Sequence, residues 1–187
     1  MRVLPAVVLA ATSACADRVL VYSTPVEVEV RVAWNDVDDG SLDSDQAVVA
    51  DAGATYEAFL DGARAAMGVD QPSSLQVVAA EVALRSTSGD VAALEQIYAG
   101  DLSVALAATG MGAGVEVATV AVGPGAAQGP LTTASLADAF DAADPLFADL
   151  LTSGYRIRLV GDVAPGFEDA REMVQVAVTL VFLARAD

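Results

Sequence analysis

The densest group of residues that could do chemistry is acidic and lies between positions 35 and 45, where the sequence reads NDVDDGSLDSD. Hard cations such as Ca²⁺ bind six to eight oxygen ligands, which an Asp-rich loop with a glycine turn can supply. When Gly40 is aligned with the glycine of a helix–loop–helix calcium site, Val37 takes a ligand position and Gln46 replaces the bidentate Glu. We therefore expect a solvated turn that leads into a helix. A weak Ca²⁺ site is the alternative, and its candidate ligands are Asp36, Asp38, Asp39, Asp43 and Asp45.

A second acidic group surrounds Arg171 and consists of Glu168, Asp169 and Glu172. Two carboxylates about 5 to 9.5 Å apart are what a glycosidase needs. The sequence contains 26 Asp and Glu residues, so it cannot identify such a pair. A solvated charged loop is the simpler interpretation, and a carboxylate-based hydrolase stays open as an alternative.

The residue types that are missing exclude many reactions. The chain has no His and no Lys, and Cys15 is its single cysteine. Ser-His-Asp triads, His-ligated zinc, Schiff bases and phosphate-binding P-loops are therefore excluded, as is a disulfide within one chain. We expect a protein that is not an enzyme, with no catalytic or cofactor-binding residues and no cofactor apart from the weak Ca²⁺ candidate.

Charge and hydropathy limit the partners. The 26 acidic residues face only nine basic ones, all Arg, which gives a formal net charge of −17. Nucleic acid is not an expected partner, because its binding proteins neutralise phosphates with Lys and Arg. The same charge disfavours contact with anionic lipid head groups. Because 55% of the residues are hydrophobic, one folded domain with a real core is expected.

The first fifteen residues form an apolar leader. Arg2 precedes an apolar run from Val3 to Ala11 and the small residues Thr12 to Ala14, as in a secretory signal. The run is too short to span a bilayer, which takes about 20 apolar residues. Its end, Ser13-Ala14-Cys15, resembles the lipobox of bacterial lipoproteins, with Thr12 in place of the usual aliphatic residue.

The lipobox resemblance implies that the thiol of Cys15 is acylated and anchors the protein in a bacterial cell envelope. Ala16 follows the cysteine, which implies the outer rather than the inner membrane. The expected organisation is a signal peptide at 1–14, a lipid-anchored segment at 15–25 and one domain at 26–187. The alternatives are plain secretion and a buried N-terminal strand in which the cysteine is incidental.

Six segments are expected to be strands. Residues 26–34 alternate apolar and polar side chains, as do 155–159, which is typical of strands with one buried face. Segment 173–183 is apolar on both faces and is expected to be central in its sheet. Trp34 extends the apolar face of its strand, so we expect it in the core, with a sugar-stacking platform of Trp34 and Tyr22 as the alternative. The remaining strands are expected at 75–85, 102–108 and 115–122.

One amphipathic helix is expected from about Asp45 to Met67, with Asp43, Ser44 or Asp45 as its cap and Gly68 just beyond its end. A second helical pattern, from Leu136 to Leu150, is broken by Pro145. Arg156 and Arg158 share one face of their strand and are expected to pair with acidic residues at 27 and 29 across the sheet.

These elements predict a mainly β fold, an antiparallel β-sandwich with one packed amphipathic helix, with α+β as the alternative. The order of elements loosely resembles uncharacterised β-sandwich lipoproteins of bacterial envelopes. The predicted function is a lipid-anchored envelope protein with a non-enzymatic binding or structural role, whose partner is an unknown envelope protein or glycan. The two alternatives are a Ca²⁺-assisted carbohydrate-binding or adhesion module and the carboxylate-based hydrolase.

Overall fold

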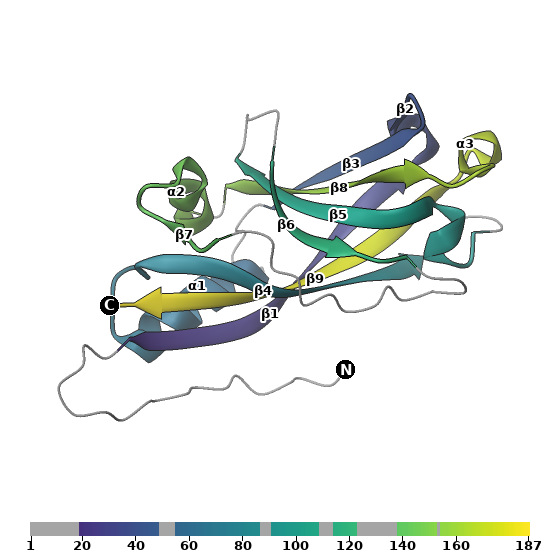
Figure 1. Cartoon of the computed structure of the whole chain (residues 1–187). Coiled ribbons are helices and arrows are strands. Elements are labelled where there is room, and N and C mark those ends of the chain that lie inside the picture. The colour runs from purple at the N-terminus through teal and green to yellow at the C-terminus, as the bar shows by residue number, and fades with distance from the viewer. Residues whose placement is uncertain (1–18, 49–54, 87–90, 109–113, 123–137, 153) are drawn as a thin grey trace.

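Two antiparallel sheets pack together in the computed structural model, which describes residues 19–48, 55–86, 91–108, 114–122, 138–152 and 154–187 (Figure 1). Sheet A has the strand order β1-β9-β4-β7 and sheet B the order β2-β3-β8-β5-β6. The few helices are short. This architecture confirms the predicted mainly β, sandwich-like fold.

The strands of sheet A are β1 (Leu20–Ala33), β9 (Met173–Ala186), β4 (Ser74–Ser86) and β7 (Phe140–Asp141). The strands of sheet B are β2 (Val37–Asp38), β3 (Ser41–Val48), β8 (Tyr155–Val163), β5 (Tyr98–Ala108) and β6 (Val115–Val120).

The six expected strands are all present, and the strand β9 is central as predicted, between β1 and β4. β1 pairs with β9 without a bulge from Leu20 opposite Ala186 to Ala33 opposite Met173. β1 begins within the segment 15–25 that the sequence assigned to the anchored N-terminus. In Figure 1, β1 and β9 run from the end that holds the C-terminus to the end that holds β2 and α3 (Phe167–Ala170).

The predicted start of the first helix is wrong. The helix α1 spans Thr55–Met67, and the preceding segment Ser41–Val48 is the strand β3. Leu42, Ser44 and Val48 are buried and Asp43 and Asp45 are exposed, so this segment alternates as a strand does. Residues 49–54 lie outside the described part of the chain. The predicted helix end is confirmed, since Gly68 has a φ of +69° and its N–H donates to the carbonyl of Arg64 (2.9 Å).

Pro145 starts a helix and does not interrupt one. The helix α2 spans Pro145–Thr152, where the missing N–H of a proline at the first position costs nothing. Phe140 lies in β7, and Leu136 lies outside the described residues. The described residues also form two short 3-10 helices, η1 (Trp34–Asp36) and η2 (Leu94–Gln96). No helix in the described part of the chain is both long and apolar enough to cross a membrane.

An aromatic cluster joins α1 to both sheets. Tyr56 and Phe59 of α1 pack against Phe182 of β9, with ring centroids 5.1 and 5.5 Å away. Tyr56 also contacts Tyr155 of β8 edge-on at 4.7 Å. Its hydroxyl donates to the carbonyl of Leu150 (2.8 Å), which ties α1 to α2. These contacts explain how the amphipathic helix that the sequence predicted packs against both sheets.

Candidate functional site

The first of the predicted metal ligands, Asp36, holds the turn between β1 and β3. Its Oδ2 accepts hydrogen bonds from the N–H of Ala33 (2.9 Å) and from the hydroxyl of Ser44 (2.8 Å). Ser44 is only 1% exposed, so its hydroxyl depends on this acceptor. Asp36 therefore has a structural role at the point where the chain leaves sheet A and enters sheet B.

Asp38 and Asp39 lie in the tight turn that follows. Asp38 pairs with Ser41 in the β2–β3 hairpin, and both turn residues, Asp39 and Gly40, have positive φ angles of 48° and 80°. Two positive φ angles in succession are typical of the turns that join two-residue hairpins, and Asp and Gly tolerate them. Both acidic side chains are exposed.

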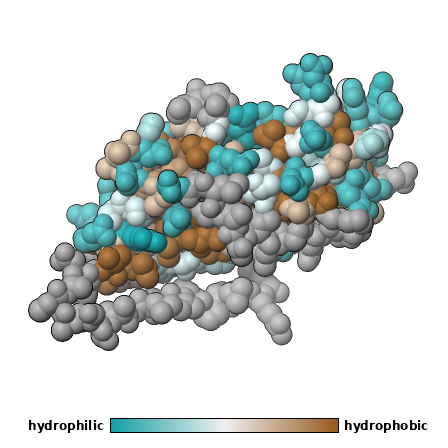
Figure 2. Space-filling model, in the orientation of Figure 1, coloured by the Kyte–Doolittle hydropathy of each residue, from teal (hydrophilic) through white to brown (hydrophobic). Residues whose placement is uncertain are grey.

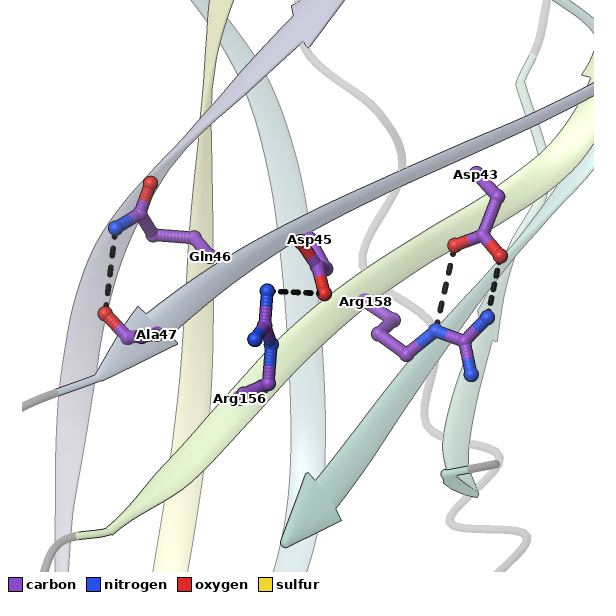
Figure 3. Close-up of polar contacts among 6 residues, drawn as sticks. All are labelled: Asp43, Asp45, Gln46, Ala47, Arg156 and Arg158. Carbon is purple, nitrogen blue, oxygen red and sulfur yellow. Dashed lines mark hydrogen bonds and ion pairs between the residues drawn. The ribbon is translucent and has the colours of Figure 1, made fainter. Parts of the chain in front are cut away.

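Asp43 and Asp45 pair with arginines of the neighbouring strand (Figure 3). Arg158 contacts Asp43 through two nitrogens, its Nε lying 3.3 Å from Oδ1, and Arg156 pairs with Asp45. The hydrogen bond to Asp43 raises the pKa of the Arg158 guanidinium. The predicted partners of these arginines were wrong, because residues 27 and 29 lie in sheet A and β8 lies in sheet B. Exposed pairs of this kind contribute about 0 to 1 kcal/mol each.

The structure thus uses the five Asp residues separately and does not bring their carboxylates together. Among the described residues, no three acidic, His or Cys side chains form a group that could hold a metal ion. The sequence analysis missed the alternation of buried and exposed side chains in residues 41–48, which is typical of a strand. This strand, β3, pairs with β8, which carries the two arginines.

Replacement of Asp36 by Ala is expected to lower the free energy of unfolding by about 2 kcal/mol, because the buried hydroxyl of Ser44 loses its acceptor. Asp38→Ala removes the same charge from an exposed site and is expected to change stability by less than about 0.5 kcal/mol. Urea unfolding followed by circular dichroism measures both. Equal losses in the two variants would show that Asp36 acts only through its charge.

Trp34 is not in the core, contrary to the prediction, because 39% of its surface is exposed. It is the first residue of η1, just past the last β1–β9 pair, and its N–H donates to the carbonyl of Glu172 (3.1 Å). The guanidinium of Arg171 lies over the indole, 5.7 Å from the ring centroid, within cation–π range. Arg171 has a φ of 53°, a left-handed conformation that is uncommon outside glycine.

A cavity of about 530 Å³ lies between η2 and α3. Glu172 lines it, and the backbone carbonyl of the same residue accepts the hydrogen bond from the backbone N–H of Trp34. The apolar part of its wall includes Val91 and Phe167, and Glu95 supplies a second carboxylate. Figure 2 shows hydrophilic side chains gathered at this end of the molecule.

Hydrogen bonds from backbone N–H groups position the two sides of this cavity. The N–H of Ala164 donates to the carbonyl of Ile97 (2.8 Å), which links the segment before α3 to η2. The side-chain Oε1 of Gln96 accepts from the N–H groups of Ala92 (2.6 Å) and Ala93 (3.0 Å) and so fixes the turn that carries Glu95. Phe167 is 2% exposed and anchors α3 in the core.

Of the second predicted acidic group, only Glu172 lines this cavity, while Glu168 and Asp169 are exposed on α3. The sequence reading missed Glu95, which lies 77 positions before Glu172 and shares no motif with it. A second cavity, of about 500 Å³, lies beside α2, and its carboxylate, Asp144, accepts from the N–H of Leu146 (2.8 Å) at the start of that helix.

No protein-family model matches the sequence, and neither does any curated protein at a significant level. The predicted lipidation residue, Cys15, lies outside the described residues, as does the predicted signal peptide at 1–14. The site at the η2–α3 end is therefore argued from its geometry alone.

Proposed function

We propose that the chain is a lipid-anchored protein of the bacterial cell envelope with a non-enzymatic binding role, and that it binds its partner at the η2–α3 end. The observation that carries the binding role is the exposed Trp34 with the guanidinium of Arg171 over its ring, in η1, which is in contact with α3. The support for the anchor is the Ser13-Ala14-Cys15 sequence after a short apolar run. Chemistry based on His, Lys or a second Cys has no residues to use.

The length of β1 sets the distance between the proposed anchor and the proposed binding end. Leu20 follows Cys15 by five positions, and Val19 and Leu20 are exposed apolar residues at 48% and 37%. From Leu20, β1 runs 14 residues to Ala33, next to Trp34. At about 3.3 Å per residue this is roughly 45 Å. An anchor at Cys15 would hold the Leu20 end at the bilayer and present the Trp34 end away from it.

A Ca²⁺-assisted carbohydrate-binding module is the second candidate, because an exposed Trp34 is what a sugar-stacking site requires. Its calcium has less support, since Asp36 holds the turn and Asp43 and Asp45 pair with arginines. Calorimetry with millimolar Ca²⁺ tests this candidate, and the absence of both heat and a shift in melting temperature would remove it.

The anchor is tested by replacing Cys15 with Ser in the full chain. The native protein is expected in the membrane fraction with an intact mass that corresponds to an acylated chain starting at Cys15. Cys15→Ser is expected to lose the lipid mass and to leave the membrane fraction, because the hydroxyl cannot replace the acylated thiol. Ser13→Ala, which keeps the thiol and a small side chain, is the matched control and is expected to stay anchored. A native chain of unmodified mass that starts at Met1 would refute the anchor.

A further inference from the structure

We propose that Asp39 is a site of spontaneous covalent modification, at which its side chain closes to a succinimide with the backbone nitrogen of Gly40 and reopens as isoaspartate. This inference does not depend on the binding role proposed above. The sequence holds two Asp-Gly pairs, Asp39-Gly40 and Asp61-Gly62. A glycine after the aspartate favours ring closure, because it has no Cβ to hinder the attacking nitrogen. The two pairs lie in different surroundings, and the first is the reactive one.

The reaction uses only the chain and water. The nitrogen of Gly40 attacks Cγ of Asp39, a C–N bond forms, and the carboxyl hydroxyl leaves as water together with the N–H proton. Water then opens the ring at one of its two carbonyl carbons. Cleavage of the bond between Cγ and nitrogen restores aspartate, whereas cleavage of the bond between the backbone carbonyl carbon and nitrogen gives isoaspartate. The side-chain methylene then belongs to the main chain, and the charge is unchanged.

At the first pair the attacking nitrogen is available. Asp39 and Gly40 are both exposed, and they form the turn between β2 and β3 with positive φ angles. In the part of the chain that the structure describes, the N–H of Gly40 donates no hydrogen bond. A Cβ at Gly40 would have no other atom within 4 Å, so ring closure at this turn meets no steric barrier from the rest of the fold.

Ring closure also requires the turn to move, and the hairpin that holds this turn is small. β2 consists of Val37 and Asp38 at the edge of sheet B, the first half-buried and the second exposed. Opening of the hairpin therefore uncovers little apolar surface. The carbonyl of Gly40 accepts the N–H of Val163 (2.9 Å), which ties the turn to β8. The φ of 48° at Asp39 is uncommon for a residue with a Cβ, and opening relieves it.

The second pair is held in the helix α1. The N–H of Gly62 lies inside this helix and donates to the carbonyl four residues earlier. The hydroxyl of Tyr22 lies so close to Gly62 that a Cβ there would clash with it, so this part of α1 is packed against β1. The carboxylate of Asp61 accepts a hydrogen bond from Arg64 (3.0 Å). Ring closure at Asp61 therefore requires α1 to open, although its side chain is as exposed as that of Asp39.

Isoaspartate at Asp39 changes the end of the molecule that holds β2 and α3 (Figure 1). The main chain of the turn becomes one atom longer, so a two-residue turn with positive φ at both positions no longer joins the two strands. We expect the pairing of Asp38 with Ser41 and the hydrogen bond from Val163 to Gly40 to be lost. Faster hydrogen exchange at the Val163 amide in the modified chain measures this loss.

The test is incubation of the full chain, in detergent at neutral pH and below its melting temperature, followed by digestion with trypsin. Because trypsin cuts after arginine, both pairs fall in one peptide, 32–64, and electron-transfer fragmentation locates isoaspartate within it. In the folded chain we expect isoaspartate to accumulate at Asp39 at least about tenfold faster than at Asp61, since α1 must first open. In urea that unfolds the chain, the two sites are expected to react at similar rates.

Two variants test the chemistry at position 39. Asp39→Asn keeps a pair that this turn favours and has a better leaving group, ammonia, so it is expected to be modified faster than the native chain. Asp39→Glu keeps the charge but has to close a larger ring, so it is expected to form no imide while Asp61 reacts in urea as before. Asp61→Glu is the matched control and is expected to leave the rate at Asp39 unchanged.

Equal rates at Asp39 and Asp61 in the folded chain would overturn the proposal, because the dipeptide alone would then decide the reaction. Isoaspartate at both sites in urea but at neither site in the folded chain would overturn it as well, because the turn would then protect Asp39. Neither outcome bears on the anchor or on the binding end, which are measured separately.

Discussion

Between pH 9 and pH 11 the free energy of unfolding is expected to fall by about 4 kcal/mol, because three tyrosines are buried in the folded chain. Tyr56, Tyr98 and Tyr155 are each at most 1% exposed. Burial raises the pKa of all three above the usual value near 10. For Tyr98, the nearby carboxylates of Asp36 and Asp43 raise the pKa further.

The direction of this pH dependence follows from the number of protons bound by the folded and the unfolded chain. Below pH 9 the tyrosines are protonated in both the folded and the unfolded chain, so they add no pH dependence. Above pH 10 the unfolded chain releases three protons that the folded chain retains, and stability therefore falls as pH rises. Each group contributes about 1.4 kcal/mol per pH unit once its unfolded form is fully ionised. The chain has no lysine to titrate in the same range.

Urea unfolding at pH 9, 10 and 11 measures the loss, and absorbance at 295 nm follows tyrosinate. We expect three of the four tyrosines to ionise in the same transition that removes the circular dichroism signal. Each single Tyr→Phe replacement is expected to reduce the pH slope by one third. An unchanged slope in Tyr98→Phe would contradict the assignment to buried tyrosines.

At pH 7 the three Tyr→Phe replacements are not all expected to change the free energy of unfolding in the same direction. The hydroxyls of Tyr98 and Tyr155 are buried and have no hydrogen-bond partner among the described residues. Tyr98→Phe and Tyr155→Phe are therefore expected to leave stability unchanged or to raise it by about 1 kcal/mol. Tyr56→Phe loses the hydrogen bond to the Leu150 carbonyl and is expected to cost about 1 kcal/mol.

The strands were the part of the fold that local sequence pattern could predict. Val26, Val30 and Val32 are buried, and the polar residues between them are exposed, as the alternation in 26–34 indicated. The central place of β9 was predictable as well, because a run that is apolar on both faces is typical of a strand in the interior of a sheet.

Where prediction failed, a neighbouring strand decided the outcome. Asp43 and Asp45 fit a helix N-terminus by residue type, but they lie in β3 opposite the arginines of β8. Trp34 continues the apolar alternation, yet the chain leaves the sheet one residue earlier, where Asp36 accepts the N–H of Ala33. The ion pairs of β3 have no local signal, because their arginines lie more than 100 positions further along the chain, whereas Asp36 and Ala33 are only three positions apart.

The candidate site was even harder to predict from the sequence than the helix start and the position of Trp34. Glu95 and Glu172 come from segments without a shared motif, and only the folded chain brings these segments to one cavity. The residues that looked most like a site, the five Asp residues at 36–45, serve the turn, the hairpin and the ion pairs. In an acidic chain, carboxylate density is a poor guide to a site, whereas a shared cavity is a specific one.

Phe182→Ala is expected to lower the free energy of unfolding by about 4 kcal/mol, a large share of the 5 to 15 kcal/mol typical of a domain. Phe182 is fully buried in the central strand β9. Its ring contacts Tyr56 and Phe59 of α1 and lies 6.4 Å from Tyr155 of sheet B. The truncation removes the aromatic contacts of three elements and leaves a cavity between the layers.

Leu183→Ala is the matched control, because the next side chain of β9 lies on the opposite, half-buried face of sheet A. It is expected to cost about 1 kcal/mol, and Phe182→Leu, which refills most of the volume, about 1.5 kcal/mol. Urea unfolding measures all three. A loss below about 2 kcal/mol in Phe182→Ala would show that α1 contributes little to joining the sheets. A loss near 4 kcal/mol would show that the cluster contributes strongly to packing α1 and both sheets together.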